Sequence, residues 1–163
     1  MATLRAALGG KIPDWYVSLL SKLPISGIEV GWQAFPPEED FDGIEWLEIL
    51  DAPLIKEINL DGYPGQILFE LGYFCFGYGS TWAGNCFAVN CQEEDPAVYE
   101  VWHDAARDKQ KMEKAIEELS GVKMVARSFS EFFNGAVPPK LGAQLGISDQ
   151  AVDPDSSTFN INL

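Results

Sequence analysis

The most apolar stretch of the chain runs from Ile67 to Val89 and is interrupted at its centre by glycines. Its first part, Ile67–Phe76, is a nearly continuous apolar run, which is typical of a strand covered on both faces. A second apolar run, Cys86–Val89, follows the interruption. The glycines in the gap are Gly77, Gly79 and Gly84. Because glycine tolerates positive φ angles, this pattern predicts a central β-hairpin with a long glycine-rich loop.

The segment before this hairpin predicts one helix and several strands. Apolar residues recur at helical spacing between Ile12 and Leu23, and Pro13 stands where a first-turn proline is tolerated. Ile28–Trp32 predicts a short strand, and Leu54–Leu60 predicts another. Ile44–Leu50 fits either a strand or a helical turn, because its apolar residues are too dense for simple alternation.

The segment after the hairpin alternates strands and helices. Ala97–His103 predicts a strand, Asp104–Ser120 a surface helix, and Val122–Ala126 a further short strand. Ser128 and Glu131 have the spacing of a capping box at the start of a short helix. A helix this short is unstable alone, so we expect its phenylalanines to dock it on the sheet.

This order of elements predicts an α+β fold with one domain, in which helices pack against an antiparallel sheet of about five to six strands. The chain of 163 residues is long enough for one sizeable core, and its 47% apolar content is that of a globular protein. We expect residues 1–137 to form the domain. Residues 138–163 are dominated by polar and turn residues, which predicts a loosely packed C-terminal extension.

The net charge of −14 bears on which class of partner the protein can bind. A protein that binds the phosphate backbone needs a basic face, so nucleic-acid binding is disfavoured. An acidic surface suits a basic protein partner or simply keeps the protein soluble. Two acidic loops are candidate contacts: Glu38, Glu39 and Asp40 in one, and Glu93, Glu94 and Asp95 in the other.

The cysteines and the apolar segments give no sign of a metal, a cofactor or a membrane. Cys75 and Cys86 lie inside apolar runs and Cys91 follows closely, which favours buried, reduced thiols. A zinc site built from these three and His103 is the less favoured alternative, because no C-x-x-C pair is present. No cofactor is predicted. The N-terminal apolar segment is too short for a signal peptide, and a cytoplasmic protein is expected.

The sequence contains none of the common catalytic motifs: no phosphate-binding loop, no G-x-S-x-G and no H-E-x-x-H. His103 stands beside Asp104, but neighbours on a strand point to opposite faces, so a structural histidine is favoured over a catalytic one. Acid pairs such as Glu45 with Glu48, or Glu93 with Glu94, are not singled out by any pattern. We therefore expect a protein that is not an enzyme.

Four motifs, in this order, resemble the SUKH superfamily of fungal cell-wall-synthesis regulators and bacterial immunity proteins. The first is IPDWY with the leucines that follow it, and the second is the glycine-rich hairpin FGYG with GNCF. The third is DPAVY with a trailing His-Asp, and the fourth is the closing helix in ARSFSEFF. The resemblance extends from Ile12 to Phe133.

The resemblance implies a non-enzymatic protein-binding domain. Its bacterial members typically neutralise a toxin, often a nuclease, by binding it, which favours an immunity-type protein with a basic toxin domain as partner. A regulatory or scaffold module of the fungal type is the alternative, and a small enzyme using His103 is a third. The shared motifs are structural, so they transfer no functional residue. Tyr78 and Trp82 in the glycine-rich loop are further candidate contacts, because exposed aromatics are typical interface anchors.

Overall fold

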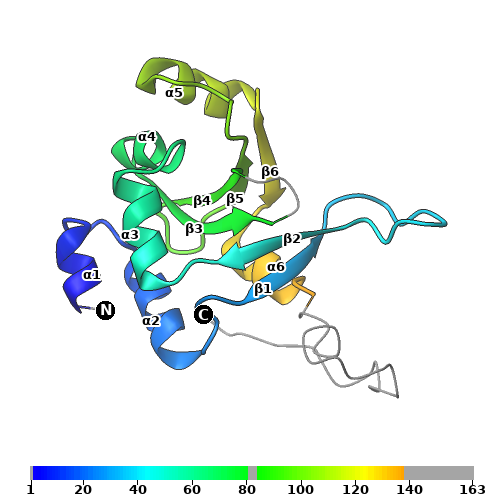
Figure 1. Cartoon of the computed structure of the whole chain (residues 1–163), viewed down its shortest axis with the longest axis horizontal. Coiled ribbons are helices and arrows are strands. Elements are labelled where there is room, and N and C mark those ends of the chain that lie inside the picture. The colour runs from blue at the N-terminus through cyan, green and yellow to red at the C-terminus, as the bar shows by residue number, and fades with distance from the viewer. Residues whose placement is uncertain (1, 81–83, 138–163) are drawn as a thin grey trace.

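A computed structural model describes residues 2–80 and 84–137, which fold into one six-stranded antiparallel sheet with helices on both of its faces (Figure 1). Each strand pairs with the next along the chain, so the sheet is a meander. The predicted α+β class is confirmed. The strands are β1 (Glu29–Gln33), β2 (Ile44–Ile49), β3 (Tyr73–Gly79), β4 (Cys86–Asn90), β5 (Val98–Val101) and β6 (Val122–Ala126).

The described helices are short, and the longest of them has ten residues. They are α1 (Ala2–Ala7), α2 (Asp14–Lys22), α3 (Ala52–Leu60), α4 (Gly65–Glu70), α5 (Lys109–Glu118) and α6 (Phe129–Asn134). Helices α2 and α6 and the strands β1, β4, β5 and β6 match their predicted segments to within a few residues. The prediction for residues 138–163 concerns a segment outside the described residues.

The larger core lies between one face of the sheet and α1, α2 and α6, and its centre is aromatic. The ring centroids of Tyr16 and Phe74 are 5.1 Å apart, and those of Phe76 and Phe129 are 5.2 Å apart. The capping box holds α6 in place: the Glu131 N–H donates to Ser128 Oγ at 3.0 Å. The Glu131 carboxylate accepts from the Arg127 N–H rather than from Ser128. The predicted docking of α6 by its phenylalanines is confirmed.

A smaller core lies between the other face of the sheet and helices α4 and α5. Leu68 of α4 and Met112 of α5 are fully buried against Cys75 and Cys86, which are neighbours on β3 and β4. Helix α5 is shorter than the predicted segment Asp104–Ser120. It begins only after Asp108, whose carboxylate caps it by accepting from the Lys111 N–H at 2.9 Å.

The prediction of a strand at Leu54–Leu60 is wrong, because this segment is α3. The Asp51 carboxylate accepts from the Leu54 N–H at 3.0 Å, which caps the helix, and Pro53 stands in its first turn. Pro53 therefore starts the helix instead of separating two strands. The ambiguity of the preceding segment is resolved in favour of a strand, β2.

The predicted strand Ile67–Phe76 is only half right. Residues 65–70 form α4, and the strand begins at Tyr73. Gly65 lets α4 approach α3, because a Cβ atom there would lie 2.4 Å from the Ile58 carbonyl oxygen. Gly72, with φ of +90°, then turns the chain into β3. A continuous apolar run cannot by itself distinguish a buried helix from a buried strand.

The sheet curls strongly enough that its last strand approaches the end of its first. Lys123 of β6 donates from Nζ to the Ala34 carbonyl oxygen, just after β1, at 3.4 Å. The outer edge of β1 is covered by Val137, which exchanges two backbone hydrogen bonds with Gly31. Figure 1 also shows the connection between β1 and β2 extending away from the rest of the molecule.

A buried asparagine ties α3 to the sheet and provides a test of this fold. The Asn59 side chain donates to the Cys75 carbonyl at 2.9 Å and accepts from the Cys75 N–H at 2.9 Å. Asn59→Leu leaves both backbone groups unpaired, so we expect the free energy of unfolding to fall by about 3 kcal/mol. Urea unfolding measures it. Glu57→Leu, on the exposed side of α3, is the control and should change stability by less than about 0.5 kcal/mol.

Candidate partner-binding site

Two glutamates occupy positions of the sheet that face the core. On β2, Glu45 alternates with Leu47 and Ile49, and all three are buried. On β5, Glu100 lies opposite Phe87 of β4 and Lys123 of β6. Glu45 is 5% exposed and Glu100 is 4% exposed. Carboxylates are rarely buried to this extent, so their surroundings have to account for them.

Both glutamates line a pocket of about 640 Å³ on the inner face of the curled sheet. Its described lining comes from strands and loops and includes no helix residue. The lining residues are Phe35, Glu45, Asn85, Glu100, Trp102, His103, Asp104 and Lys123. The pocket therefore combines aromatic walls with several carboxylates. We name it the arm-base pocket, because Phe35 lies near the start of the projecting connection between β1 and β2.

The Glu100 carboxyl is held in place and is electrostatically perturbed. Burial raises its pKa above the ordinary value, and the negative charge of Glu45 acts in the same direction. A hydrogen bond from Asn85 Nδ2 to Glu100 Oε1, at 2.7 Å, and the Lys123 ammonium oppose the rise without cancelling it. Asn85 Oδ1 also accepts from the His103 N–H at 3.2 Å. The Asn85 amide therefore links the Glu100 carboxyl to the turn that follows β5.

A cation of the protein itself lies against aromatic rings at this site. Lys123 Nζ is 4.7 Å from the centroid of the Trp32 ring and 4.5 Å from that of Phe35. The ammonium is attracted by the faces of both rings. The indole N–H of Trp32 is buried without a hydrogen-bond partner among the described residues. The two ring faces therefore place the Lys123 ammonium beside the arm-base pocket.

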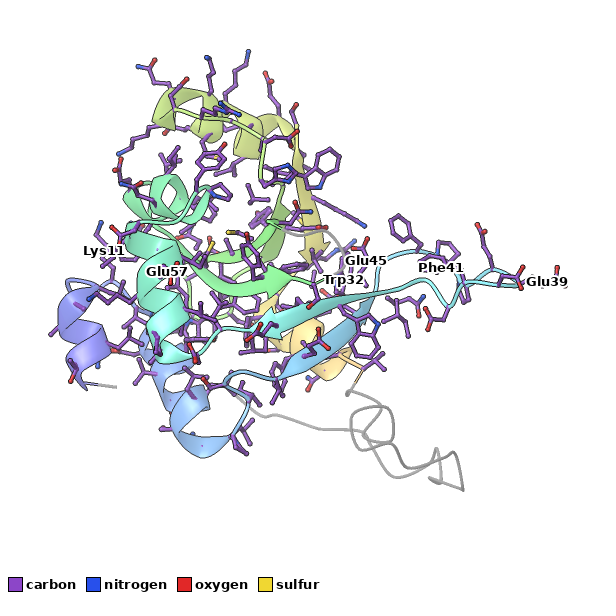
Figure 2. All side chains as sticks on the ribbon, in the orientation of Figure 1. Lys11, Trp32, Glu39, Phe41, Glu45 and Glu57 are labelled. Atoms are coloured by element: carbon purple, nitrogen blue, oxygen red, sulfur yellow. The ribbon has the colours of Figure 1, made fainter. Side chains whose placement is uncertain are left out.

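The connection between β1 and β2, residues 34–43, forms a projecting arm that we name the hairpin arm (Figure 2). Glu38 and Phe41 exchange backbone hydrogen bonds at its tip, at 2.7 and 3.3 Å. At its base, the Gln33 side chain donates to the Phe35 and Asp42 carbonyls. Phe35 and Phe41 are each 46% exposed, and their ring centroids are 6.3 Å apart. The tip of the arm is thus held by its own hydrogen bonds, whereas its base also contacts Lys123 of β6 through Ala34 and Phe35.

The hairpin arm contains the first predicted acidic loop. Glu38, Glu39 and Asp40 are all exposed, and Figure 2 shows Glu39 at the outermost end of the arm. Together with Asp42 they give the arm four acidic residues, whereas residues 34–43 include no lysine or arginine. The same arm carries the exposed rings of Phe35 and Phe41. Sequence analysis did not include these two residues among the candidate contacts.

The second predicted acidic loop forms the turn between β4 and β5, and two of its side chains have internal partners. Glu93 accepts from Asn90 Nδ2 at 2.8 Å. Asp95 accepts from the Ser130 N–H at 2.9 Å and from the Ser130 hydroxyl at 2.8 Å. Asp95 therefore anchors the first turn of α6, while Glu94 is exposed beside it.

This second loop is far from the hairpin arm. It lines a different, larger cavity of about 1220 Å³, to which Lys11 and Trp15 also contribute. In Figure 2, Lys11 lies on the opposite side of the molecule from Glu39. The two acidic loops that look equivalent in the sequence thus cannot contact the same small partner surface.

The glycine-rich loop between β3 and β4 is described only in part. The predicted hairpin itself is confirmed, and Gly77 lets its strands pack closely, since a Cβ atom there would lie 2.4 Å from Leu47 Cδ1. Tyr78 is half-buried and packs against both cores. Burial raises the pKa of its hydroxyl. Trp82 lies outside the described residues.

His103 and Asp104 do not belong to a strand, because β5 ends at Val101. The expectation that they face opposite sides is therefore wrong: they follow the strand in a turn, and both line the arm-base pocket. The acid pair Glu45 and Glu48 is not formed either, since positions three apart on β2 point to opposite faces. The negative charge of Glu45 instead acts on Glu100, whose pKa it raises.

The cysteines are free thiols in the structure. Cys75 and Cys86 are buried, and burial raises the pKa of Cys75 well above its usual range. Burial also raises the pKa of Cys91 to about 11. Over residues 2–80 and 84–137, no three or more His, Cys, Asp or Glu side chains are grouped so that they could hold a metal ion. The described helices include none long and apolar enough to cross a membrane.

Sequence reasoning considered Glu45, His103 and Asp104 only for other roles, and it did not predict the arm-base pocket. A signal was present at Glu45, because IEWLEI places it in phase with Leu47 and Ile49 if the segment is a strand. The same holds for Glu100, which is in phase with Val98. No local pattern indicates that these two strands, separated by two others, curl toward each other.

The role of Asp95 as an anchor of α6 gives a first test at this surface. Burial acts to raise the pKa of its carboxyl, but the hydrogen bonds from Ser130 and its neighbours outweigh this and lower the pKa. Asp95→Ala should destabilise the protein by about 1 kcal/mol at neutral pH. The contribution of Asp95 is present above its ordinary pKa and is lost as the pH falls through the lowered folded-state value.

Urea unfolding of wild type and Asp95→Ala between about pH 2 and pH 7 measures this dependence. Glu94→Ala, at the neighbouring exposed position, is the matched control and should leave stability nearly unchanged. A loss of stability that is the same at every pH would contradict the assignment.

The raised pKa of Glu100 gives a second test, with the opposite sign. The groups that face it are Glu45, Asn85 and Lys123, with His103 and Asp104 at the pocket wall. Protonated Glu100 favours the folded state, so this contribution is complete below its ordinary pKa and is lost as the pH rises through the folded-state value. Glu100→Gln keeps an acceptor for Asn85 and removes the charge.

We expect Glu100→Gln to match wild-type stability near pH 4 and to exceed it near pH 7, as measured by urea unfolding. Glu48→Gln, on the same sheet but facing the other side, should show no such crossover. A Glu100→Gln protein less stable than wild type at about pH 7 would show that the ionised carboxylate stabilises the fold.

A family model described as the SMI1 / KNR4 family (SUKH-1) matches residues 2–135. The match extends from α1 to the end of α6 and so includes every described strand, the hairpin arm and the arm-base pocket. No curated protein and no solved structure matches the chain.

Proposed function

Because the chain belongs to the SMI1 / KNR4 family (SUKH-1), we propose that it is a non-enzymatic protein-binding domain of the immunity type. In this proposal it neutralises a basic toxin domain, such as a nuclease, by binding to it in the cytoplasm. The three free thiols, two of them buried, are compatible with a reducing compartment. The binding surface is the hairpin arm together with the arm-base pocket.

The observation that carries the proposal is the composition and order of the hairpin arm. A segment of ten residues, exposed from Phe35 to Asp42, presents two phenylalanines and four acids and contains no basic residue. Aromatic residues that stay exposed beside a pocket are typical of interface anchors. Because the arm is already ordered by its own backbone hydrogen bonds, a partner would not have to order it on binding.

Charge supports the choice of partner. A nuclease needs a positive cleft to hold phosphates, and a protein of net charge −14 is attracted to such a cleft over long distances. The acidic tip of the arm projects furthest from the body, so it would meet that field first (Figure 2). Complementary charge raises the association rate, while the aromatic residues contribute to the lifetime of the complex.

The proposal predicts that charge reversal on the arm weakens binding selectively. If a neighbouring gene encodes a toxin domain, the double variant Glu38→Lys with Glu39→Lys should lower affinity for that domain by at least about tenfold, mainly through a slower association rate. Surface plasmon resonance at two salt concentrations measures both rates. Co-expression with the toxin measures protection of the cell.

The matched control is Glu113→Lys with Glu117→Lys on the exposed side of α5. Both double variants change the net charge from −14 to −10, because each Glu→Lys adds two charges. Equal effects of the two would show that only net charge matters and would remove the arm from the proposal. If the wild-type chain neither bound the neighbouring toxin nor protected cells from it, the immunity function itself would be rejected.

A second candidate is a regulatory or scaffold module, and one observation favours it. The hairpin arm and the β4–β5 turn are acidic surfaces on opposite sides of the molecule, each beside a cavity. Two such surfaces could hold two partners at once. A scaffold should retain several proteins in a pull-down, and Glu93→Lys with Glu94→Lys should release a different set from the arm variant. One tight partner, lost only with the arm variant, supports the immunity function.

A further inference from the structure

We infer that the arm-base pocket recognises one arginine side chain of the partner, held between the carboxylates of Glu45 and Glu100 and the rings of Phe35 and Trp102. This inference rests on the proposed function for the statement that the partner is a protein. It adds which side chain of that protein is recognised and which pocket of this chain binds it.

The charges that line the pocket favour a cation. Glu45, Glu100 and Asp104 contribute three carboxylates, and Lys123 is the only lysine or arginine among the described lining residues. Glu45 is close enough to Glu100 for its negative charge to raise the pKa of the Glu100 carboxyl. A second cation entering the pocket would relieve this repulsion, and both carboxylates are buried enough for the attraction to be weakly screened.

The aromatic residues favour the same ligand. Lys123 already lies against the faces of Trp32 and Phe35, which shows that a cation is accommodated by these rings. Phe35 and Trp102 remain 46% and 48% exposed at the pocket. Exposed rings beside carboxylates are the surroundings in which a planar cation can stack and donate hydrogen bonds at the same time.

Arginine fits better than lysine for a geometric reason. The two carboxylates come from β2 and β5, which are separated by two strands and brought together by the curl of the sheet. A guanidinium has five N–H donors in one plane and can bridge two acceptors, whereas an ammonium is a compact point charge. Asn85 fixes one oxygen of Glu100, which gives the acceptor a defined orientation.

The size of the pocket is compatible with a side chain from another molecule. Its volume of about 640 Å³ lies within the range of about 300–1,000 Å³ that is usual for ligand sites. It opens at the base of the hairpin arm, so a partner that contacts the arm would reach it without rearranging the sheet. An arginine in this position would be a buried, central anchor, the type of residue that dominates interface energies.

The test uses peptides rather than the unidentified partner. The chain labelled with ¹⁵N is titrated with acetyl-Gly-Arg-Gly-amide, with the lysine peptide and with the citrulline peptide, in which the guanidinium is replaced by a neutral urea of the same shape. We expect the arginine peptide to shift the Trp102 indole and Asn85 side-chain signals. The lysine peptide should bind more weakly, and the citrulline peptide at least about tenfold more weakly.

Variants assign the effect to the pocket. Glu45→Gln and Glu100→Gln should each lower the affinity for the arginine peptide by about five- to tenfold. Glu48→Gln, on the opposite face of the sheet, should change this affinity less than twofold. Lys123→Met keeps an apolar side chain against the rings and removes the competing charge, so it should strengthen binding several-fold. Thermal unfolding of each variant confirms that the fold is retained, and Glu100→Asp replaces any variant that does not fold.

The outcomes separate this inference from the function on which it rests. Equal shifts with arginine and citrulline peptides, or shifts confined to the tip of the arm or to the β4–β5 turn, would overturn the arginine pocket even if the chain protects cells from a toxin. Arginine selectivity that depends on Glu45 and Glu100 supports the pocket even if no toxin is neutralised. Weaker binding by Lys123→Met would also contradict the assignment, since Lys123 would then be part of the attraction.

Discussion

The rest of the structure depends on the aromatic packing that holds α2 and α6 against one face of the sheet. Tyr16, Phe76 and Phe129 form its centre, and their rings are in edge or tilted contact. Helix α6 is only six residues long, so it is stable only as part of this contact, with its first turn capped by Ser128 and anchored by Asp95. Burial of these rings fixes which side of each strand faces inward.

That constraint also explains why carboxylates are found inside the sheet. Along β2 and β5, inward-facing positions such as Leu47, Ile49 and Val98 belong to the core. Glu45 and Glu100 face inward too, but they line the described pocket, to which no helix residue contributes. The curl of the sheet closes this end partly on itself and brings Lys123 across to Trp32 and Phe35. The connection between β1 and β2 extends beyond the covered region as the hairpin arm. A pocket and an acidic arm are therefore adjacent because both lie beyond the reach of the helices.

Local signals in the sequence were sufficient for much of the fold. The spacing of apolar residues located α2, and the capping box located α6, because both signals are contained in a few neighbouring residues. The errors occurred where the evidence was not local. Leu54–Leu60 and residues 67–70 are apolar enough for either a strand or a helix, and their choice depends on the cap at Asp51 and on the close approach of Gly65 to Ile58.

The candidate site was predicted less well, for the same reason. Glu38, Glu39 and Asp40 were found because an acidic, proline-rich loop is exposed wherever it lies. Glu45 and Glu100 were not found as a pair, because 55 positions of sequence separate them and only the curl of the sheet joins them. Asp95 looked like a surface acid, but its hydrogen bonds to Ser130 give it a structural role that no local pattern indicates.

The most direct measurement of the central claim is a hydrogen–deuterium exchange footprint of the whole chain with and without the basic toxin domain that we propose as its partner. The account predicts that protection on binding is concentrated in residues 34–43 of the hairpin arm and in residues 101–104 at the pocket. Protection of α4, α5 or the β4–β5 turn, with the arm still exchanging as in the free protein, would contradict it.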